Sequence, residues 1–439
     1  MTRRLVRQPL DREILRLAVP ALGALIAEPL YILADTAVVG RLGTDRLAGL
    51  ALASTVLLVG YSIFIFLAYG TTAAVSRRLG AGDESGAAHQ AVQSLWLAGL
   101  IGIAIAGAVA VGAVPLLRAL GGEGEVLGHA TTYLRISLLG MPAMLLVLAG
   151  TGYLRGLQDT RTPLLIAVAS AATNLVVELV LVFGLGFDIG ASAAATVVAQ
   201  VGSAACYLLI IQRAVRVHAT RLRPHWPTIA RLGVVGRDLF VRTVALRGAI
   251  VATTAAAARS GTSALAAHQI TFEVWNLMAL TLDAVAIAGQ AMVGRHLGAG
   301  DSASARAVGD RIIRWGLGTG VVLGAVLLAG HRALPSLFTD DGTVVAIGGS
   351  LLVVAAVAQP LNGVVFALDG LLIGAGDMTW LAVAMALATG GYLPLVGAVV
   401  ALDLGVAALW WSFTAFMAMR LATLLGRWRG GRWAVVGVA

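Results

Sequence analysis

The feature that most constrains this chain is a series of long apolar runs of about 20 residues each, the length that an α-helix needs to cross a bilayer. Only helices and closed barrels satisfy their backbone hydrogen bonds in lipid. The runs lack the strict alternation of barrel strands, so they are predicted to be helices. Twelve spans are expected, over residues 14–39, 47–70, 91–115, 131–154, 163–184, 189–213, 236–258, 265–292, 311–332, 345–372, 380–401 and 404–426.

The composition excludes most soluble classes. Of the 439 residues, 59% are hydrophobic and 12% are charged, whereas a soluble domain carries about 25% charged residues. The chain therefore cannot be a cytosolic enzyme, a nucleic-acid-binding protein or a disordered protein. Its net charge of +9 comes from arginines that gather in certain loops. The one cysteine, Cys206, lies in an apolar stretch, so an inert thiol is expected and an intramolecular disulfide is excluded.

The arginine distribution predicts the orientation in the membrane. Most arginines fall on one side of the predicted spans, which includes the N-terminus with Arg3 and Arg4, the segment from Arg213 to Arg242, and the C-terminal end from Arg420. Positively charged loops stay in the cytoplasm. Both termini are therefore expected to be cytoplasmic, which agrees with an even number of spans. The first apolar run is too long for a cleaved signal peptide, so a multi-pass protein of the plasma (inner) membrane is predicted.

An internal repeat divides the chain. The segment LGAGD occurs at residues 79–83 and again 218 residues later, at 297–301. The same shift aligns Pro142 with Pro360 and Asp159 with Asp377. The predicted organisation is an N-lobe over 1–215, a cytoplasmic linker over 216–235 and a C-lobe over 236–439. The predicted fold is thus an all-α membrane protein with twelve transmembrane helices in two pseudo-symmetric six-helix lobes, a plan typical of transporters.

Ionisable groups inside predicted spans are the candidate functional residues, because a charge in the bilayer is costly. They are Glu28, Asp35, Glu178, Asp283 and Asp369. The first three lie in the N-terminal half, where no cation is evident inside the spans. Like charges held close in a low dielectric cannot all ionise, so at least one of these three acids is expected to bind a proton near neutral pH. An ionised one can bind Na⁺ or an organic cation. The alternative is that they are helix-end or hydrogen-bonded packing residues.

Other motifs carry less weight. Gly374–Asp377 matches the GxGD pattern of intramembrane aspartyl proteases, but the same GAGD occurs at 80–83 and 298–301, where a helix-end turn is expected. The sequence has no P-loop and no histidine pair at metal-ligand spacing. Pro20 and Pro29 lie within the first span, where proline removes a helix hydrogen bond and introduces a kink.

Several segments resemble the MATE (multidrug and toxic compound extrusion) family, in its DinF-like branch. The residues that carry the resemblance are 18–20, 27–30, 33–40, 155–163, 267–270 and 368–377. The resemblance implies two pseudo-symmetric lobes around a central cavity. It also implies a non-enzymatic multidrug exporter that antiports organic cations or amphipathic drugs against H⁺ or Na⁺. The implied protein is a monomer in contact with membrane lipids, with no cofactor beyond the coupling ion.

The resemblance also implies roles for particular residues. Asp35, Asn174, Glu178 and Thr196 correspond to the coupling-cation site, where Na⁺ is the metal expected if one binds. Glu178 stands where the family has an aspartate. The substrate cavity is assigned Glu28, Tyr31 and Asp35, helix bending is assigned to Pro20, and the acids Asp283 and Asp369 are candidates for a C-lobe ion site. Two other functions stay open: a flippase for a lipid-linked precursor, and an intramembrane enzyme.

Overall fold

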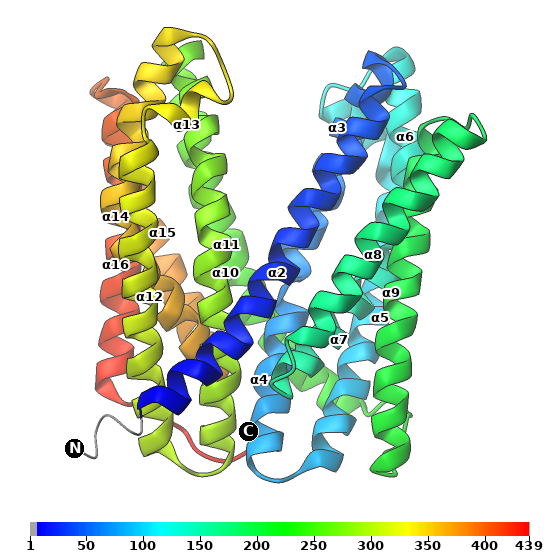
Figure 1. The fold of residues 1–439 in the computed structure, drawn as a ribbon, viewed down its shortest axis with the longest axis vertical. Helices are drawn as coiled ribbons and strands as arrows, with labels where there is room; N and C mark the ends of the chain where they lie inside the picture. Colours follow the sequence, from blue (N-terminus) through cyan, green and yellow to red (C-terminus); the bar gives the residue numbers. More distant parts are fainter. Residues whose placement is uncertain (1–6, 439) are drawn as a thin grey trace. The chain divides into compact units, whose positions relative to one another are not determined.

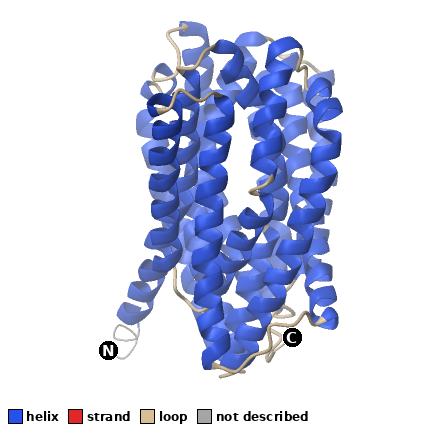
Figure 2. Ribbon diagram, turned by 90° about the vertical axis from the view of Figure 1, so that its right-hand side faces the viewer, coloured by secondary structure: helices blue, strands red, loops and turns tan. Residues whose placement is uncertain are grey.

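The computed structural model describes residues 7–438, and all its regular elements in that range are helices joined by short connections (Figures 1 and 2). Arg3 and Arg4 of the predicted N-terminal charge cluster lie outside the described residues. The elements are α2 (Arg7–Gly40), α3 (Thr44–Phe64), α4 (Phe66–Gly80), α5 (Glu84–Ala119), α6 (Gly124–Leu138), α7 (Met141–Gly156), α8 (Arg161–Leu179), the π-helix η1 (Val180–Gly184), α9 (Ile189–Val217), α10 (Trp226–Arg259), α11 (Thr262–Gly298), α12 (Ser302–Gly330), α13 (Ala333–Ser336), α14 (Gly342–Gly374), α15 (Met378–Ala401) and α16 (Gly405–Gly430).

The number of spans agrees with the prediction. Eleven helical segments of the described chain are long and apolar enough to cross a membrane, and α6 with α7, which meet at a bend of 49°, supply the twelfth. The protein is therefore an integral multi-pass membrane protein. Several helices begin earlier than predicted, among them α5 at Glu84 and α12 at Ser302, and two further differences concern the second and seventh spans. The second span is divided at Ile65 into α3 and α4, and α10 begins at Trp226, well before the predicted residue 236.

The helices form two compact units. Unit 1 holds the described residues up to Ala18 together with Arg237–Gly437, and unit 2 holds Val19–Gly236. The helix α2 is thus divided between the units next to Pro20, and α10 is divided after Gly236. These two division points are separated by 218 residues, the same shift as the sequence repeat. In each half of the repeat, the first helix is therefore divided between the two units at the equivalent position.

Polar contacts hold the start of each divided helix. In unit 1, the guanidinium of Arg311 donates to both carboxylate oxygens of Asp11 at 2.6 and 2.5 Å, and Trp315 Nε1 donates to the same carboxylate at 2.8 Å. In unit 2, the side-chain oxygen of Gln93 accepts from the backbone N–H of His225 at 2.7 Å, just before α10. The first turns of α2 are therefore fixed to α12, and the chain before α10 is fixed to α5.

The repeated GAGD segments are helix-end turns, as predicted. Gly82, Gly300 and Gly376 have φ between 71° and 78°, a left-handed conformation that glycine adopts without strain. The aspartate that follows Gly82 accepts a hydrogen bond from Gly86 N–H and so caps α5, and Asp301 caps α12 in the same way through Ser304 N–H, each at 2.8 Å. These residues end one helix and start the next.

Candidate functional site

The candidate site of unit 2 is centred on the carboxylate of Asp35 in α2, whose residue is 5% exposed. Ser192 of α9 donates its hydroxyl to Asp35 Oδ1 at 2.5 Å. Tyr133 of α6 donates its phenol to Asp35 Oδ2 at 3.2 Å. Each carboxylate oxygen therefore has a hydroxyl donor from a different helix, which fixes the side chain of Asp35 inside the helix bundle.

A second set of polar contacts is organised around Thr196, one turn after Ser192 on α9. Its hydroxyl lies 2.7 Å from the phenol oxygen of Tyr31 and accepts from Asn174 Nδ2 at 3.2 Å. It also contacts the carbonyl of Ser192 at 3.2 Å. The structure thus brings together four of the predicted residues, Asp35, Tyr31, Asn174 and Thr196, and joins them through Ser192.

Glu178 is the most unusual member of this cluster. It lies one turn after Asn174 on α8, and its residue is fully buried. Neither carboxylate oxygen forms a hydrogen bond of ordinary geometry, and the side chains that interact with it are Asp35 and Ser192. The carboxylates of Asp35 and Glu178 lie close enough for their negative charges to repel each other. The helix α8 ends at Leu179, one residue after Glu178, and the π-helix η1 begins at Val180. Such π-turns occur frequently at functional sites.

Two other predicted residues of α2 lie outside the hydrogen-bonded cluster. Glu28 is half-buried and interacts with the phenol of Tyr61, so Glu28 and Asp35 have different partners. Pro20 lies within α2, which is one helix from Arg7 to Gly40, next to the division between the units. Its position fits a bending point, although the helix itself is continuous.

The predicted C-lobe acids lie in a different environment. Asp369 of α14 accepts from Arg242 Nη2 of α10 at 2.8 Å and forms a second, short contact with Arg420 of α16. Asp283 of α11 is an electrostatic neighbour of Arg420. The sequence-based orientation counts Arg242 and Arg420 among the loop and C-terminal charges, whereas the structure places them inside helices. Both arginines lie within long helices, and their side chains are only 12% and 4% exposed.

Sequence reasoning did not find Ser192 and Tyr133, the two donors to Asp35. Ser192 precedes Thr196 by four residues, so the two share a face of one helix, and this spacing could have identified it. Tyr133 gives no such signal, because its partner Asp35 lies 98 residues away in the sequence. The ion pairs of Asp369 were also not found, since its partners are separated from it by 127 and 51 residues.

The fold and the buried polar cluster define a polytopic membrane protein of the transporter class. A family model described as MatE matches residues 20–180 and 245–399. The protein DETOXIFICATION 44, chloroplastic, of Arabidopsis thaliana is 34% identical over 95% of this chain and 82% of its own length. The DNA damage-inducible protein F of Escherichia coli is 28% identical over 96% and 94%.

The chain therefore belongs to the MatE family, the family of the MATE transporters. Solved structures agree on the fold. A MATE crystal structure described as the bent conformation matches with a TM-score of 0.86 and 22% identity, covering 98% of this chain and 97% of that chain. A MATE structure described as the straight conformation gives 0.82 and 21%, covering 97% and 96%. Family members are transporters, and the twelve-helix, two-lobe fold class is confirmed.

Proposed function

We propose that this protein is a secondary active multidrug exporter that antiports organic cations or amphipathic drugs against H⁺. The observation that carries this proposal is the pair Asp35 and Glu178 in unit 2. Glu178 is fully buried and forms no hydrogen bond of ordinary geometry, and it has a second carboxylate as its electrostatic neighbour. Two carboxylates in such a low-dielectric site cannot both carry a charge, so the pair holds a proton.

The proton and the drug then compete for the same carboxylates. When the pair loses its proton, the added negative charge attracts a cationic drug or stabilises the pocket that holds it. When the pair is protonated again, this attraction is lost and the drug is released. The hydroxyls of Ser192 and Tyr133 accommodate both states of Asp35, because a hydroxyl can donate to a carboxylate or accept from a carboxylic acid.

The names of relatives support the substrate class. A protein of Rhizobium meliloti described as a probable multidrug resistance protein, NorM, is 28% identical over 95% of this chain and 92% of its own length. We further propose that the protein works as a monomer in the plasma membrane with both termini in the cytoplasm. The excess of arginine on one side of the spans supports this orientation.

Efflux of a fluorescent lipophilic cation from proteoliposomes tests the proposal. A pH gradient alone, and then a Na⁺ gradient alone, is imposed on wild-type protein and on Asp35→Asn. The proposal expects efflux that is driven by the pH gradient and lost in the variant. Efflux of the variant at the wild-type rate would overturn the mechanism. Efflux that only a Na⁺ gradient drives would replace the proton with Na⁺ at Asp35, Asn174, Glu178 and Thr196.

The alternative of a lipid-linked precursor flippase is not favoured by any specific observation. Such a substrate carries a pyrophosphate and requires a cationic site. The buried arginines of unit 1, Arg242 and Arg420, are already engaged with Asp369. An intramembrane enzyme requires a catalytic acid at the GxGD motif, but Asp377 forms an ion pair with Arg427 at a helix-end turn.

A further inference from the structure

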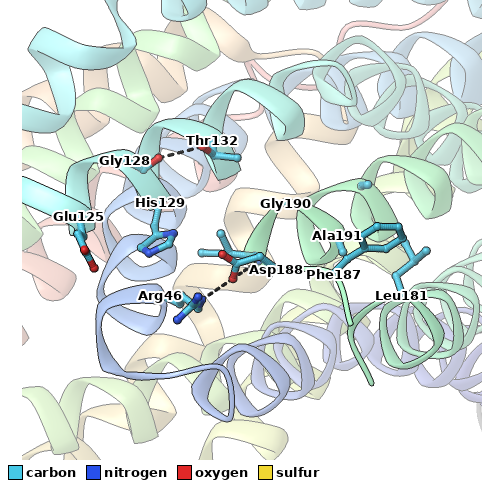
Figure 3. Close-up of a pocket in the computed structure, with 12 residues that line it drawn as sticks. Arg46, Glu125, Gly128, His129, Thr132, Leu181, Phe187, Asp188, Gly190 and Ala191 are labelled. Carbon is cyan, nitrogen blue, oxygen red and sulfur yellow. Dashed lines mark hydrogen bonds and ion pairs between the residues drawn. The ribbon is translucent and has the colours of Figure 1, made fainter. Parts of the chain in front are cut away.

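A pocket of about 950 Å³ lies in unit 2 at the end of α2 where the chain turns into α3, and where η1 leads into α9. Charged and polar side chains line part of it, among them Arg46, Glu125, His129 and Asp188. Figure 3 shows the side chains of Arg46 and Asp188 facing each other, with His129 and Glu125 on the α6 side and Leu181 on the other. No function considered so far uses this pocket.

The pocket and Asp35 are contacted by adjacent residues of the same two helices. Thr132 of α6 and Ala191 of α9 line the pocket. The residues that directly follow them, Tyr133 and Ser192, are the two hydroxyl donors to Asp35. The same two helices therefore form the wall of the pocket and hold the carboxylate behind it.

The layer between the pocket and Asp35 is apolar. Val38, one turn after Asp35 on α2, is buried together with Val182 of η1 and Ala191, and the partly buried side chains of Leu42 and Leu181 pack against them. A hydrated cation cannot pass such a layer while the layer is closed, because nothing in it replaces the water ligands. Val182 belongs to the π-helix η1, a rare element that occurs frequently at functional sites.

An ion pair ties this layer together on the pocket side. Arg46 of α3 and Asp188 form a short contact, and Arg46 Nη1 also donates to the carbonyl of Leu42 at 3.2 Å. Burial alone would raise the pKa of Asp188, but hydrogen bonds from Arg46 and from Ile189 N–H lower it. The ion pair is therefore charged at neutral pH. Its two side chains are 38% and 47% exposed, so it faces water.

We propose that Val38, Val182 and Ala191, closed by the Arg46–Asp188 ion pair, form a gate between this pocket and Asp35, and that the coupling cation reaches Asp35 through the pocket. This inference rests on the proposed coupling role of Asp35. In the proposed orientation, the pocket opens on the side of the membrane opposite to the termini. Opening the gate requires the ion pair to separate and the π-helix to move Val182 away from Val38.

Labelling of a cysteine at position 35 measures passage through the gate without requiring transport. The protein carries Asp35→Cys and Cys206→Ser, so that the probe position holds the only thiol. A small, membrane-impermeant, cationic methanethiosulfonate is added outside right-side-out vesicles. Arg46→Ala is expected to accelerate labelling about two- to fivefold, the range that loss of an exposed ion pair allows. The double variant Arg46→Ala with Val38→Ala is expected to be labelled faster still.

Two controls make the test specific. Arg259→Ala removes an exposed arginine of unit 1 that is outside the pocket, and it is expected to leave the labelling rate unchanged. Exchanging the charges by Arg46→Asp with Asp188→Arg is expected to return the rate towards that of the parent protein. A misfolded variant would not be rescued by a second charge substitution.

The outcomes separate the gate from the coupling mechanism. Equal labelling rates in all variants, or labelling only from the opposite side of the membrane, would overturn the gate. Accelerated labelling supports the access route. If the route is supported and Asp35→Asn, in otherwise unchanged protein, still exports drug at the full rate, the route leads to Asp35 but the coupling assignment fails.

Discussion

Unit 2 and unit 1 share a helical plan but differ at equivalent positions. Shifting the Asp35 cluster by 218 residues replaces Asp35 with Thr253, Asn174 with Tyr392 and Glu178 with Val396. In unit 1, Thr253 Oγ1 lies 2.6 Å from the phenol oxygen of Tyr392, so a hydrogen bond between neutral groups takes the place of the carboxylate cluster. Aromatic rings fill the surrounding space, with Tyr392 5.1 Å from Phe416 between centroids.

The charge of the two units is also organised differently. Unit 1 does bury an acid, Asp369, but two arginines neutralise it. In unit 2, two hydroxyls donate to the carboxylate of Asp35. The carboxylate of Glu178 forms no hydrogen bond of ordinary geometry. The repeat therefore supplies two similar scaffolds that surround these acids with different groups, arginines around Asp369 and hydroxyls around Asp35. The proposed coupling role belongs to the second arrangement.

The largest expected effect comes from moving the acid between the units. The double variant Asp35→Asn with Thr253→Asp places a carboxylate at the equivalent position of unit 1. We expect efflux driven by a pH gradient to fall to the level of protein-free vesicles, because Val396 provides no second acid there. The measurement is proteoliposome efflux. Rescue by Thr253→Asp, compared with Asp35→Asn alone, would show that either unit can couple.

The next effect concerns the ion pairs of unit 1. Asp369→Asn removes the ion-pair partner that Arg242 and Arg420 share, and loss of one partner from a buried pair costs about 3 kcal/mol of unfolding free energy. Thermal unfolding of the detergent-solubilised protein measures this loss. Asp35→Asn is the matched variant, and we expect it to change the stability far less, since the amide oxygen accepts from one of the two hydroxyls of Ser192 and Tyr133 and the amide NH2 can donate to the other. Equal losses would contradict the distinction between the units.

A smaller effect separates two equivalent hydroxyl networks. Thr253→Val leaves the buried phenol of Tyr392 without its partner and is expected to cost about 1 kcal/mol. Efflux should stay at the wild-type rate. Thr196→Val removes the contacts to Tyr31 and Asn174 in unit 2, with a stability loss of similar size. Only this second variant should slow efflux, and a slower Thr253→Val would instead assign a transport role to unit 1.

The smallest effect lies at the two equivalent helix caps. Hydrogen bonds from Ser304 lower the pKa of Asp301, which lies between α11 and α12. A lowered pKa adds stability above the ordinary value of the group, and this stability is lost as the pH falls through the lowered value. Asp301→Asn should therefore slightly reduce the fall of the melting temperature as the pH is lowered into the acidic range. At neutral pH, Asp83→Asn should lower the melting temperature slightly more than Asp301→Asn does, because it removes both the cap of α5 and the ion pair with Arg78. The reverse order would contradict this assignment.

The sequence predicts the parts of this molecule that depend on short-range pattern. Apolar length gives the twelve spans, and a repeated five-residue turn gives the two halves. The spacing of four residues predicts that Asn174 and Glu178 lie on the same face of one helix. Contacts between distant segments cannot be obtained in this way, which is why Tyr133 and the arginines around Asp369 were not found. An arginine near a predicted loop also gives no sign that it turns inward to meet an acid, as Arg242 does.

The division of α2 has a consequence for biosynthesis. Asp11 leaves the ribosome first, but its partners Arg311 and Trp315 are synthesised about 300 residues later. The first turns of α2 therefore wait for their contacts while most of the other spans are inserted. The chain before α10 has no such delay, since Gln93 is already in place when His225 is made. Closing the contact to Asp11 is accordingly among the last steps of assembly, and it requires the larger part of both halves to have been synthesised.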